Sequence, residues 1–196
     1  MTAIPFPNRV GAKSLARPVS RLSPPQPETL EPAARALYEA NHRENWIAAL
    51  SVNTKTAERF TRYFGSLFAP DDGLLPLTER ELIAVAVSTT NGCGLCEIHH
   101  TNALAEALGD SEKARRVALD AHLAPLTARE HALFDLAVKV TTDPKSLDDS
   151  DFETLRGLGL SDPDILEAVE VASWFNHTNR IFISLGVVPD AKYFQR

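Results

Sequence analysis

The segment Glu81–His100, ELIAVAVSTTNGCGLCEIHH, holds both cysteines of the chain, Cys93 and Cys96, as a C-x-x-C pair. Two histidines, His99 and His100, follow within about one helical turn of the second thiol. Thiols at this spacing can close and reopen a small disulfide ring, and a neighbouring imidazole and carboxylate can move the protons that such chemistry requires. The segment therefore predicts a redox site, for which the remaining sequence provides the scaffold.

The same segment predicts two helices joined by a sharp turn. Thr78-Glu-Arg-Glu81 fits the S/T-x-x-E capping box of a helix that runs to about Thr90. Asn91-Gly92 ends that helix, because glycine readily adopts the left-handed conformation that follows many helices. A second helix then begins around Cys93 and ends at Gly109.

The helical geometry suggests which side chains share a face with the thiols. If Cys93 lies at zero on a helix that turns by about 100° per residue, Cys96 lies near about −60° and His100 near about −20°. We therefore expect His100 to be the partner of both sulfur atoms, with His99, near about −120°, as the second candidate. The position of both thiols in the first turn favours a thiolate, since the helix dipole stabilises negative charge there.

Helical patterns also dominate the rest of the chain, and no convincing alternating strand is present, so the sequence predicts an all-α protein. Seven of the thirteen prolines fall within the first 32 residues. We interpret residues 1–28 as a proline-rich N-terminal arm, which packs on its own domain or on a neighbouring subunit, and residues 29–196 as the helical domain. Helices are expected after Pro32, over 55–67, from about 111 to 121, from about 125 to 142, after Asp148 or Asp149, and from Ser161 to about Gly186.

Two similar hexapeptides stand 49 residues apart. Pro76-Leu-Thr-Glu-Arg-Glu81 and Pro125-Leu-Thr-Ala-Arg-Glu130 match at five of six positions. They are either a recurring helix start or the mark of a duplicated helical unit.

Composition argues against some classes of binding partner and indicates the cellular compartment. The net charge of −6 and the lack of a Lys/Arg cluster give no support for nucleic acid or an anionic membrane as a partner. The longest apolar run, Leu82–Val87, is too short to span a bilayer. The first twenty residues lack the apolar core of a signal peptide, which makes a cytoplasmic protein the expectation. In a reducing compartment a C-x-x-C pair is more often catalytic or metal-binding than structural.

The role of Glu81 is open at this stage. As the third helical residue of a capping box, it would only bind the backbone amide of Thr78. If it turns inward instead, it can relay protons to the thiols.

The spacing E-x11-C-x-x-C-x3-H, formed by Glu81, Cys93, Cys96 and His100, resembles the AhpD-like alkylhydroperoxidases of the carboxymuconolactone decarboxylase superfamily. The flanking Leu77–Ala84 and Ser88–Cys96 look most similar to its peroxidase-related branch. The tight motif covers about twenty residues, and the helical pattern is compatible with the family over about 30–190.

The resemblance implies an all-α fold that assembles into a homo-oligomer, and a thiol-dependent peroxidase without metal or organic cofactor. Cys96 matches the family's peroxidatic cysteine, Cys93 the resolving one, and Glu81 and His100 the proton relay. The implied partners are a peroxide and a dithiol reductant, which is a lipoyl protein, a thioredoxin-like protein or a small thiol.

This chain departs from the family at one position. Well-studied members carry a histidine or aspartate between the cysteines, where this chain has Leu95. Either the relay is shorter, with His99 as a substitute, or peroxidase activity is weak and the substrate is something other than an alkyl hydroperoxide. The superfamily's decarboxylases lack the cysteine pair, which argues against lactone decarboxylation.

The sequence is also compatible with two classes of function other than a thiol peroxidase. Cys93, Cys96 and His100 could bind zinc, with His122 or His131 as the fourth ligand. Alternatively, the chain is an oligomeric helical binding protein with incidental cysteines.

Two residues of the last long helix are candidate accessory residues. Asn176 and Arg180 lie four apart and would line the pocket, although a contact between helices or subunits is the alternative.

Overall fold

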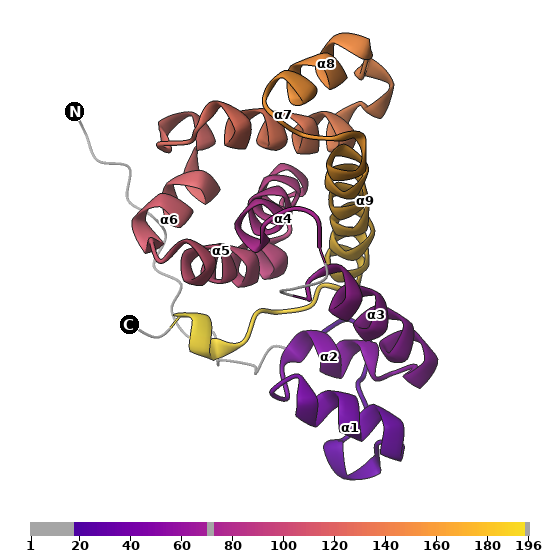
Figure 1. Cartoon of the computed structure of the whole chain (residues 1–196). Helices are drawn as coiled ribbons and strands as arrows, with labels where there is room; N and C mark the ends of the chain where they lie inside the picture. The colour runs from indigo at the N-terminus through magenta and orange to yellow at the C-terminus, as the bar shows by residue number, and fades with distance from the viewer. Residues whose placement is uncertain (1–17, 70–72, 195–196) are drawn as a thin grey trace, which may run out of the picture.

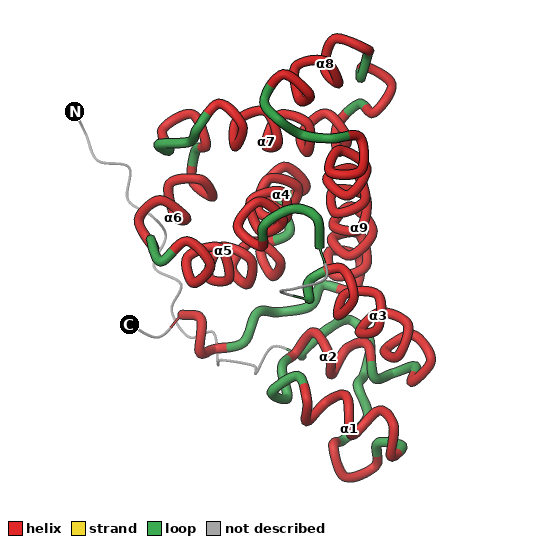
Figure 2. The backbone as a smooth tube through the Cα atoms, in the orientation of Figure 1, coloured by secondary structure: helices red, strands yellow, loops and turns green. Residues whose placement is uncertain are grey.

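The computed structural model describes residues 18–69 and 73–194, which form helices and loops without a strand (Figures 1 and 2). The predicted all-α class is therefore confirmed. The α-helices are α1 (Pro32–Ala40), α2 (Asn45–Leu50), α3 (Thr54–Leu67), α4 (Leu77–Asn91), α5 (Gly94–Leu108), α6 (Ser111–Leu119), α7 (Ala128–Thr142), α8 (Asp149–Gly157) and α9 (Asp162–Leu185). Short 3-10 turns are η1 (Pro27–Thr29), η2 (Ala121–Leu123), η3 (Pro144–Ser146) and η4 (Ala191–Phe194).

Helix α4 is the centre of the fold, with α5, α6, α7 and α9 packed around it (Figure 1). Every residue from 79 to 88 is buried. A helix that is apolar on all sides cannot lie at a surface, so the run Leu82–Val87 places α4 in the interior. Its side chains form the main hydrophobic core together with α7 and α9, which contribute residues such as Leu133 and Phe175.

The turn between α4 and α5 forms at the position that the sequence predicts. Gly92 adopts the left-handed conformation, with φ of 69° and ψ of 32°. The N–H of Cys93 donates to the carbonyl of Ser88 at 2.9 Å, the bond expected where a left-handed residue ends a helix. Cys93 then becomes the N-cap residue of α5, so the predicted helix–turn–helix around the thiols is present.

The predicted capping box at the start of α4 is wrong. Helix α4 begins two residues earlier than that motif requires, with Pro76 as the N-cap and no side-chain cap, and Thr78 lies inside the helix. In the similar hexapeptide before α7, the capping box does form between Thr127 and Glu130. The two hexapeptides thus both start helices, but their residues play different roles, and Glu81 is left free to face α5.

Helices α1, α2 and α3 form a separate lobe beside the bundle (Figure 1). The helix predicted after Pro32 stops at Ala40, and a turn with His42 and Arg43 at positive φ, 56° and 59°, leads into α2. A second hydrophobic cluster joins this lobe to the start of α5 and the end of α9. It includes Ile47, Leu50, Ala57, Phe60, Cys93, Cys96 and Phe182.

The described part of the predicted N-terminal arm packs on its own chain. The N–H of Arg21 donates to the carbonyl of Leu185 at 2.7 Å, and the N–H of Val188 donates to the carbonyl of Val19 at 3.0 Å. This pairing ties the arm to the end of α9, from which the chain continues toward η4. Residues 1–17 lie outside the described residues.

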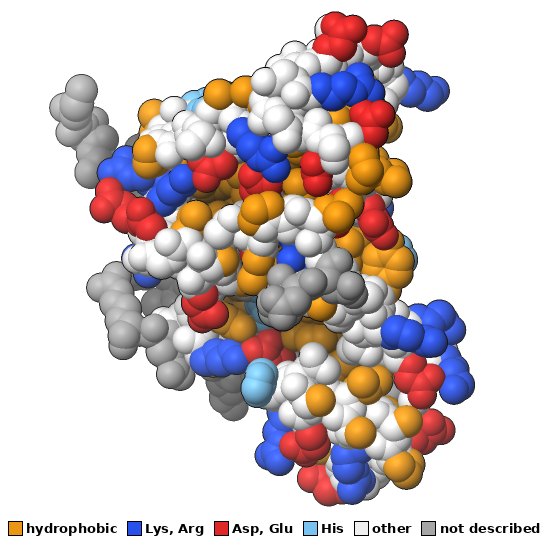
Figure 3. Space-filling model, in the orientation of Figure 1, with side chains coloured by type: hydrophobic (Ala, Val, Ile, Leu, Met, Phe, Trp, Pro, Cys, Tyr) orange, Lys and Arg blue, Asp and Glu red, His pale blue; other side chains and the backbone are white. Residues whose placement is uncertain are grey.

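The surface carries charges of both signs. On the face drawn in Figure 3, basic and acidic side chains alternate over the lobe and the bundle. Of the helices in the described ranges, none is long and apolar enough to cross a membrane.

Substitution of Gly92 tests the turn that positions the thiols. No heavy atom would crowd a Cβ at this position, so Gly92→Ala carries only the cost of the left-handed backbone, and we expect it to lower the free energy of unfolding by about 1–2 kcal/mol. Gly65 in α3 also has free space around it but a helical backbone, so Gly65→Ala should instead stabilise by about 0.5–1 kcal/mol. Urea unfolding of both variants measures the free energies of unfolding. Equal changes in the two variants would contradict the left-handed backbone at Gly92.

Candidate active site

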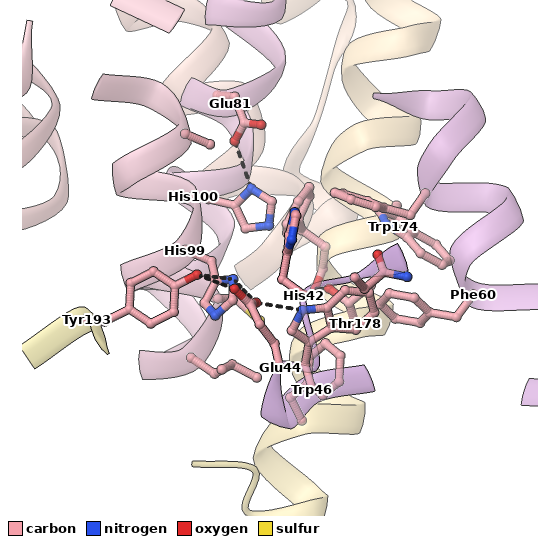
Figure 4. Close-up of a pocket in the computed structure, with 17 residues that line it drawn as sticks. His42, Glu44, Trp46, Phe60, Glu81, His99, His100, Trp174, Thr178 and Tyr193 are labelled. Atoms are coloured by element: carbon pink, nitrogen blue, oxygen red, sulfur yellow. Dashed lines mark hydrogen bonds and ion pairs between the residues drawn. The ribbon is translucent and has the colours of Figure 1, made fainter. Parts of the chain in front are cut away.

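A cavity of about 270 Å³ lies where the lobe meets α4, α5, α9 and the C-terminal segment (Figure 4). One part of its wall is aromatic and the other carries thiol, imidazole and carboxylate groups. The lining residues include Glu44, Trp46, Phe60, Phe64, Glu81, Leu95, Cys96, His99, His100, Trp174, Phe175, Phe182 and Tyr193.

The two thiols lie side by side at one end of α5. Their sulfur atoms are 2.8 Å apart and hydrogen-bonded, and both cysteines are free thiols. Cys93 is 2% exposed and Cys96 is 5% exposed. Cys96 lines the cavity and Cys93 does not, so an electrophile in the cavity meets Cys96.

The hydrogen bond between the sulfur atoms makes the two thiols unequal. The pKa of Cys93 is lowered, chiefly because the Cys96 thiol hydrogen-bonds its sulfur, and the backbone N–H groups of Leu95 and Cys96 act in the same direction. The pKa of Cys96 is raised, first by Cys93 and then by burial. Once the pair has lost one proton, the negative charge is therefore held mainly on Cys93.

Glu81 and His100 form a carboxylate–imidazole pair in the same cavity. Glu81 Oε2 is 2.7 Å from His100 Nδ1, and both side chains are largely buried (Figure 4). The imidazole edge also packs on Phe175, with ring centroids 4.5 Å apart. Of the two roles considered for Glu81, the inward one is therefore the one observed.

The expectation that His100 contacts both sulfur atoms is wrong. In the described parts of the chain, no hydrogen bond joins His100 to Cys93 or Cys96. The thiols bond to each other because the C-x-x-C turn brings them together, and the imidazole turns to the buried carboxylate of Glu81. A molecule in the cavity would have access to both Cys96 and His100.

Asn179, which the sequence did not single out, is fully buried on α9. Its Nδ2 donates to Ser88 Oγ at 3.3 Å, and its Oδ1 accepts from Asn91 Nδ2 at 3.0 Å. An asparagine inside an amphipathic helix signals a polar contact, but the sequence does not say with which neighbour.

Asn176 and Arg180, predicted as accessory residues, do not line the cavity. Asn176 Nδ2 donates to Thr141 Oγ1 at 3.0 Å, and Asn176 Oδ1 accepts from Asn91 Nδ2 at 3.1 Å. Arg180 is exposed and donates back to Asn176. Both side chains serve contacts between and along helices because they lie on the side of α9 turned away from the cavity.

His99 belongs to a second carboxylate–imidazole group, which also includes residues that the sequence analysis did not name. Its Nδ1 is 3.5 Å from Glu44 Oε2 and 3.4 Å from the Tyr193 hydroxyl (Figure 4). Glu44 also accepts hydrogen bonds from Trp46, Lys192 and Tyr193. Glu44 and Tyr193 are far from His99 in sequence, so no local pattern could predict the group.

Burial sets the charge state of His99. It lowers the pKa of the imidazole to about 4, although the nearby Glu44 carboxylate acts in the opposite direction. Burial would raise the pKa of Glu44, but the hydrogen bond from Lys192 and the other contacts bring it below its ordinary value. At neutral pH the group thus pairs a carboxylate with a neutral imidazole.

Leu95, the residue between the cysteines, is buried and lines the cavity. An alkyl side chain cannot accept or donate a proton. Any proton transfer at the thiols therefore falls to the histidines and carboxylates around the cavity.

The zinc site weighed for the thiols is not supported by the geometry. Within the described ranges, the only three His, Cys, Asp or Glu side chains whose ligand atoms lie within 4.8 Å of one another are Glu44, His99 and Asp190. This group excludes both thiols, and Lys192 already pairs with its Glu44 carboxylate. His122 is exposed in η2, and His131 lies on α7 beside α8.

A central buried helix followed by a dithiol at the start of the next helix defines an all-α protein of the AhpD type. Residues 54–139 match the carboxymuconolactone decarboxylase family. This match supports the resemblance to the AhpD-like part of this superfamily that the sequence implied. A search of the curated proteins found no match.

Three solved structures place the fold among known proteins. An uncharacterised peroxidase-related protein from Ralstonia eutropha JMP134, described as an alkylhydroperoxidase AhpD core, is 28% identical, with a TM-score of 0.84 over 91% of this chain and 96% of that one. A peroxidase-related protein from Silicibacter sp. TM1040 is 27% identical, with a TM-score of 0.86 over 94% and 99%. The debrominase Bmp8 in complex with 2,3,4-tribromopyrrole is 18% identical, with a TM-score of 0.74 over 92% and 95%, and shares the fold.

The charge state of His99 can be tested directly. We expect its imidazole to stay neutral as the pH falls through the usual histidine range and to take up a proton only near pH 4. The unfolded chain binds that proton near its ordinary pKa of about 6.5, so this histidine should make the protein less stable as the pH falls from about 6.5 to about 4. Imidazole nitrogen NMR measures the titration, with the urea-unfolded protein as the reference. Titration of His99 in the folded protein over the same pH range as in the unfolded chain would contradict the burial argument.

Proposed function

We propose that this chain is a thiol-dependent peroxidase that reduces organic hydroperoxides with the Cys93–Cys96 pair and the Glu81–His100 proton relay. The observation that carries the proposal is the placement of one thiol of a hydrogen-bonded pair and a carboxylate–imidazole pair in the wall of one largely apolar cavity. The relation to two peroxidase-related proteins supports the same reaction class.

In the first half-reaction, the Cys96 thiolate attacks the terminal oxygen of the hydroperoxide. A sulfur–oxygen bond forms, the oxygen–oxygen bond breaks, and Cys96 becomes a sulfenic acid. His100 takes up the proton that the thiol pair loses and returns it to the departing alkoxide, which leaves as an alcohol. Glu81 holds the imidazole in place and stabilises its protonated form.

In the second half-reaction, the Cys93 sulfur attacks the sulfur of the sulfenic acid. The disulfide bond forms, the sulfur–oxygen bond breaks, and the leaving hydroxide combines with the Cys93 proton to give water. An external dithiol then supplies two electrons and two protons to restore both thiols. The 2.8 Å separation of the sulfur atoms supports an intramolecular disulfide.

Access to the cavity favours one sulfur atom as the nucleophile, whereas ease of deprotonation favours the other. Cys96 faces the cavity, whereas the lowered pKa of Cys93 means that this sulfur is the first of the two to lose its proton. The two atoms share a hydrogen bond, so transfer of one proton from Cys96 to Cys93 moves the charge to the accessible sulfur. We therefore assign the attack to Cys96 and the resolving role to Cys93.

The partners and the compartment are part of the proposal. The reductant is a lipoyl protein, a thioredoxin-like protein or a small thiol, and the chain works in the cytoplasm as a homo-oligomer (a dimer, trimer or hexamer). No metal or organic cofactor is required, because both electrons come from the thiols.

Cysteine variants test the assignment of roles. When wild-type protein receives a small excess of cumene hydroperoxide, we expect it to lose two hydrogen atoms and both free thiols. Cys96→Ser should abolish turnover because it removes the nucleophile that faces the cavity. Cys93→Ser should accumulate a sulfenic acid on Cys96, because no resolving thiol remains. Intact mass, thiol counting, and peptide mass spectrometry after dimedone trapping measure these outcomes.

The same samples separate the alternatives. A sulfenic acid on Cys93 instead of Cys96 would reverse the two roles. If the wild-type thiols do not react with peroxide and the protein contains no metal, the results would favour the helical binding protein as the function. Unreactive thiols with stoichiometric zinc would favour a structural metal site.

The relay predicts a specific loss in His100→Gln. Glutamine fills similar space but cannot accept and return a proton, so kcat/KM for cumene hydroperoxide should fall by about a hundredfold or more. The exposed His122 is the matched control, and His122→Gln should behave as wild type. Steady-state kinetics over a range of pH measures both variants, and wild-type kcat/KM in His100→Gln would exclude the relay.

A further inference from the structure

One wall of the cavity is built from aromatic rings that three helices contribute. The ring of Phe60 on α3 has its centroid 5.1 Å from that of Trp174 and 5.5 Å from that of Phe182, both on α9. Trp46 on α2 adds a further ring, 5.7 Å from Phe60. All of these side chains line the cavity, and Figure 4 shows Phe60 and Trp174 on the side opposite to Glu81. The cavity therefore offers an apolar face to a ligand and a polar face beside it.

The attacking sulfur adjoins this aromatic wall. Cys96 belongs to the same hydrophobic cluster as Phe60 and Phe182, and it lines the cavity with them. Leu95, the residue between the cysteines, adds another apolar side chain to the lining. A ligand whose apolar part packs on the rings thus has the Cys96 thiol as a neighbour.

The size of the cavity favours a compact apolar ligand. Its volume is about 270 Å³. For comparison, an apolar cavity of about 150 Å³ binds benzene, so this one has room for a ring with short substituents. A long fatty-acyl chain has about three times as many carbon atoms as benzene, and part of it would stay in water. Hydrogen peroxide would leave the aromatic wall without a contact, although apolar walls provide most of the affinity of such a site.

The charges around the cavity oppose an anionic substrate. Among the residues that the structure describes, no lysine or arginine lines the cavity, whereas the carboxylates of Glu44 and Glu81 do. Lys192 pairs with Glu44 but is not part of the lining. A carboxylate on a substrate would therefore lie among like charges, to which attack by Cys96 adds a thiolate. Like charges brought together in this way disfavour binding.

The three histidines of the lining do not supply a fixed positive charge. Burial lowers the pKa of His99 to about 4, so its imidazole is neutral at neutral pH. A proton on His100 lies beside Glu81 Oε2, at 2.7 Å from Nδ1, and that pair then carries no net charge. His42 is exposed, and water and salt screen an exposed charge. An anionic substrate thus lacks a buried cation to compensate for its lost hydration.

We propose that the cavity selects uncharged aryl hydroperoxides, whose ring packs against Phe60, Trp46 and Trp174 while the terminal peroxide oxygen meets Cys96 Sγ. This inference rests on the proposed function, because Cys96 has to be the nucleophile. The oxygen–oxygen bond breaks as described above, and the fragment that carries the ring leaves as an uncharged alcohol. Aromatic rings prefer stacked or edge-to-face contacts with one another, which favours an aryl group over an alkyl group of the same bulk.

Matched hydroperoxides test the proposal on the wild-type full chain, with each kcat/KM divided by the rate constant of the same compound with free cysteine. Cumene hydroperoxide and tert-butyl hydroperoxide differ by phenyl against methyl, and the phenyl compound should be better by about tenfold or more. Replacement of phenyl by cyclohexyl keeps the bulk without the aromatic contacts and should lower kcat/KM. A para-carboxylate on the ring should react about tenfold or more slowly than the para-carboxamide, which has the same shape without the charge.

Variants of the wall test where the selectivity arises. Phe60→Leu keeps an apolar side chain but removes the ring, so the preference for phenyl over methyl should fall by about threefold or more. Phe134 on α7 packs in the core and does not line the cavity, so Phe134→Leu is the matched control and should keep the wild-type preference. Circular dichroism checks folding. If Phe60→Leu does not fold, Trp174→Leu replaces it, since the indole N–H of Trp174 has no hydrogen-bond partner to lose among the described residues.

Binding of the product alcohols separates this inference from the proposed function, because it requires no thiol chemistry. Isothermal titration calorimetry of the reduced protein should show that cumyl alcohol binds more tightly than tert-butyl alcohol, and that Phe60→Leu reduces the difference. If the alcohols bind in this way while the thiols are inert to every hydroperoxide, the aromatic binding site stands and the proposed peroxidase function is overturned.

Other outcomes would overturn the selectivity and leave the peroxidase in place. These are turnover with equal normalised kcat/KM for the phenyl compound and either its methyl or its cyclohexyl counterpart, and a carboxylate that reacts as fast as the carboxamide. A loss of preference in Phe134→Leu as large as that in Phe60→Leu would equally exclude the aromatic wall as its source.

Discussion

The buried carboxylate of Glu81 sets the constraint on which the site depends. A carboxylate on the central helix, removed from water, costs several kcal/mol unless a partner compensates for it. His100 provides that partner at 2.7 Å, which fixes the rotation of α5 against α4. Cys96 and His99 stand at fixed offsets on the same helix, so this rotation also turns them toward the cavity. One contact between neighbouring helices therefore orients the reactive end of α5.

The sequence predicts what depends on near neighbours along the chain. The pairing of Cys93 with Cys96 and the turn at Gly92 both follow from spacings of a few residues, and both are present. The capping box predicted at Thr78 does not form, because α4 begins at Leu77 and Thr78 therefore lies inside the helix. That shift leaves Glu81 without the capping role and turned toward His100, while the proton relay is part of the proposed function.

Contacts between distant segments were not predictable in the same way. Asn176 and Asn179 are only three residues apart on α9, and the rotation of that helix within the bundle decides which amide is fully buried. Asn179 is fully buried against Ser88, whereas Asn176, the residue predicted from the sequence, contacts Thr141. Glu44 and Tyr193 join His99 from opposite ends of the described chain, where no periodic pattern connects them.

The inner position of Cys93 has a consequence for the return to the reduced state. In a Cys93–Cys96 disulfide, the sulfur that faces the cavity is Cys96, so an incoming thiolate would form a mixed disulfide there and release Cys93. A thiol of low pKa is the better leaving group, and the N–H groups at the start of α5 lower the pKa of Cys93. Under the proposed function, the sulfur outside the cavity wall is thus the better leaving group, so a reductant would attack Cys96 and release Cys93.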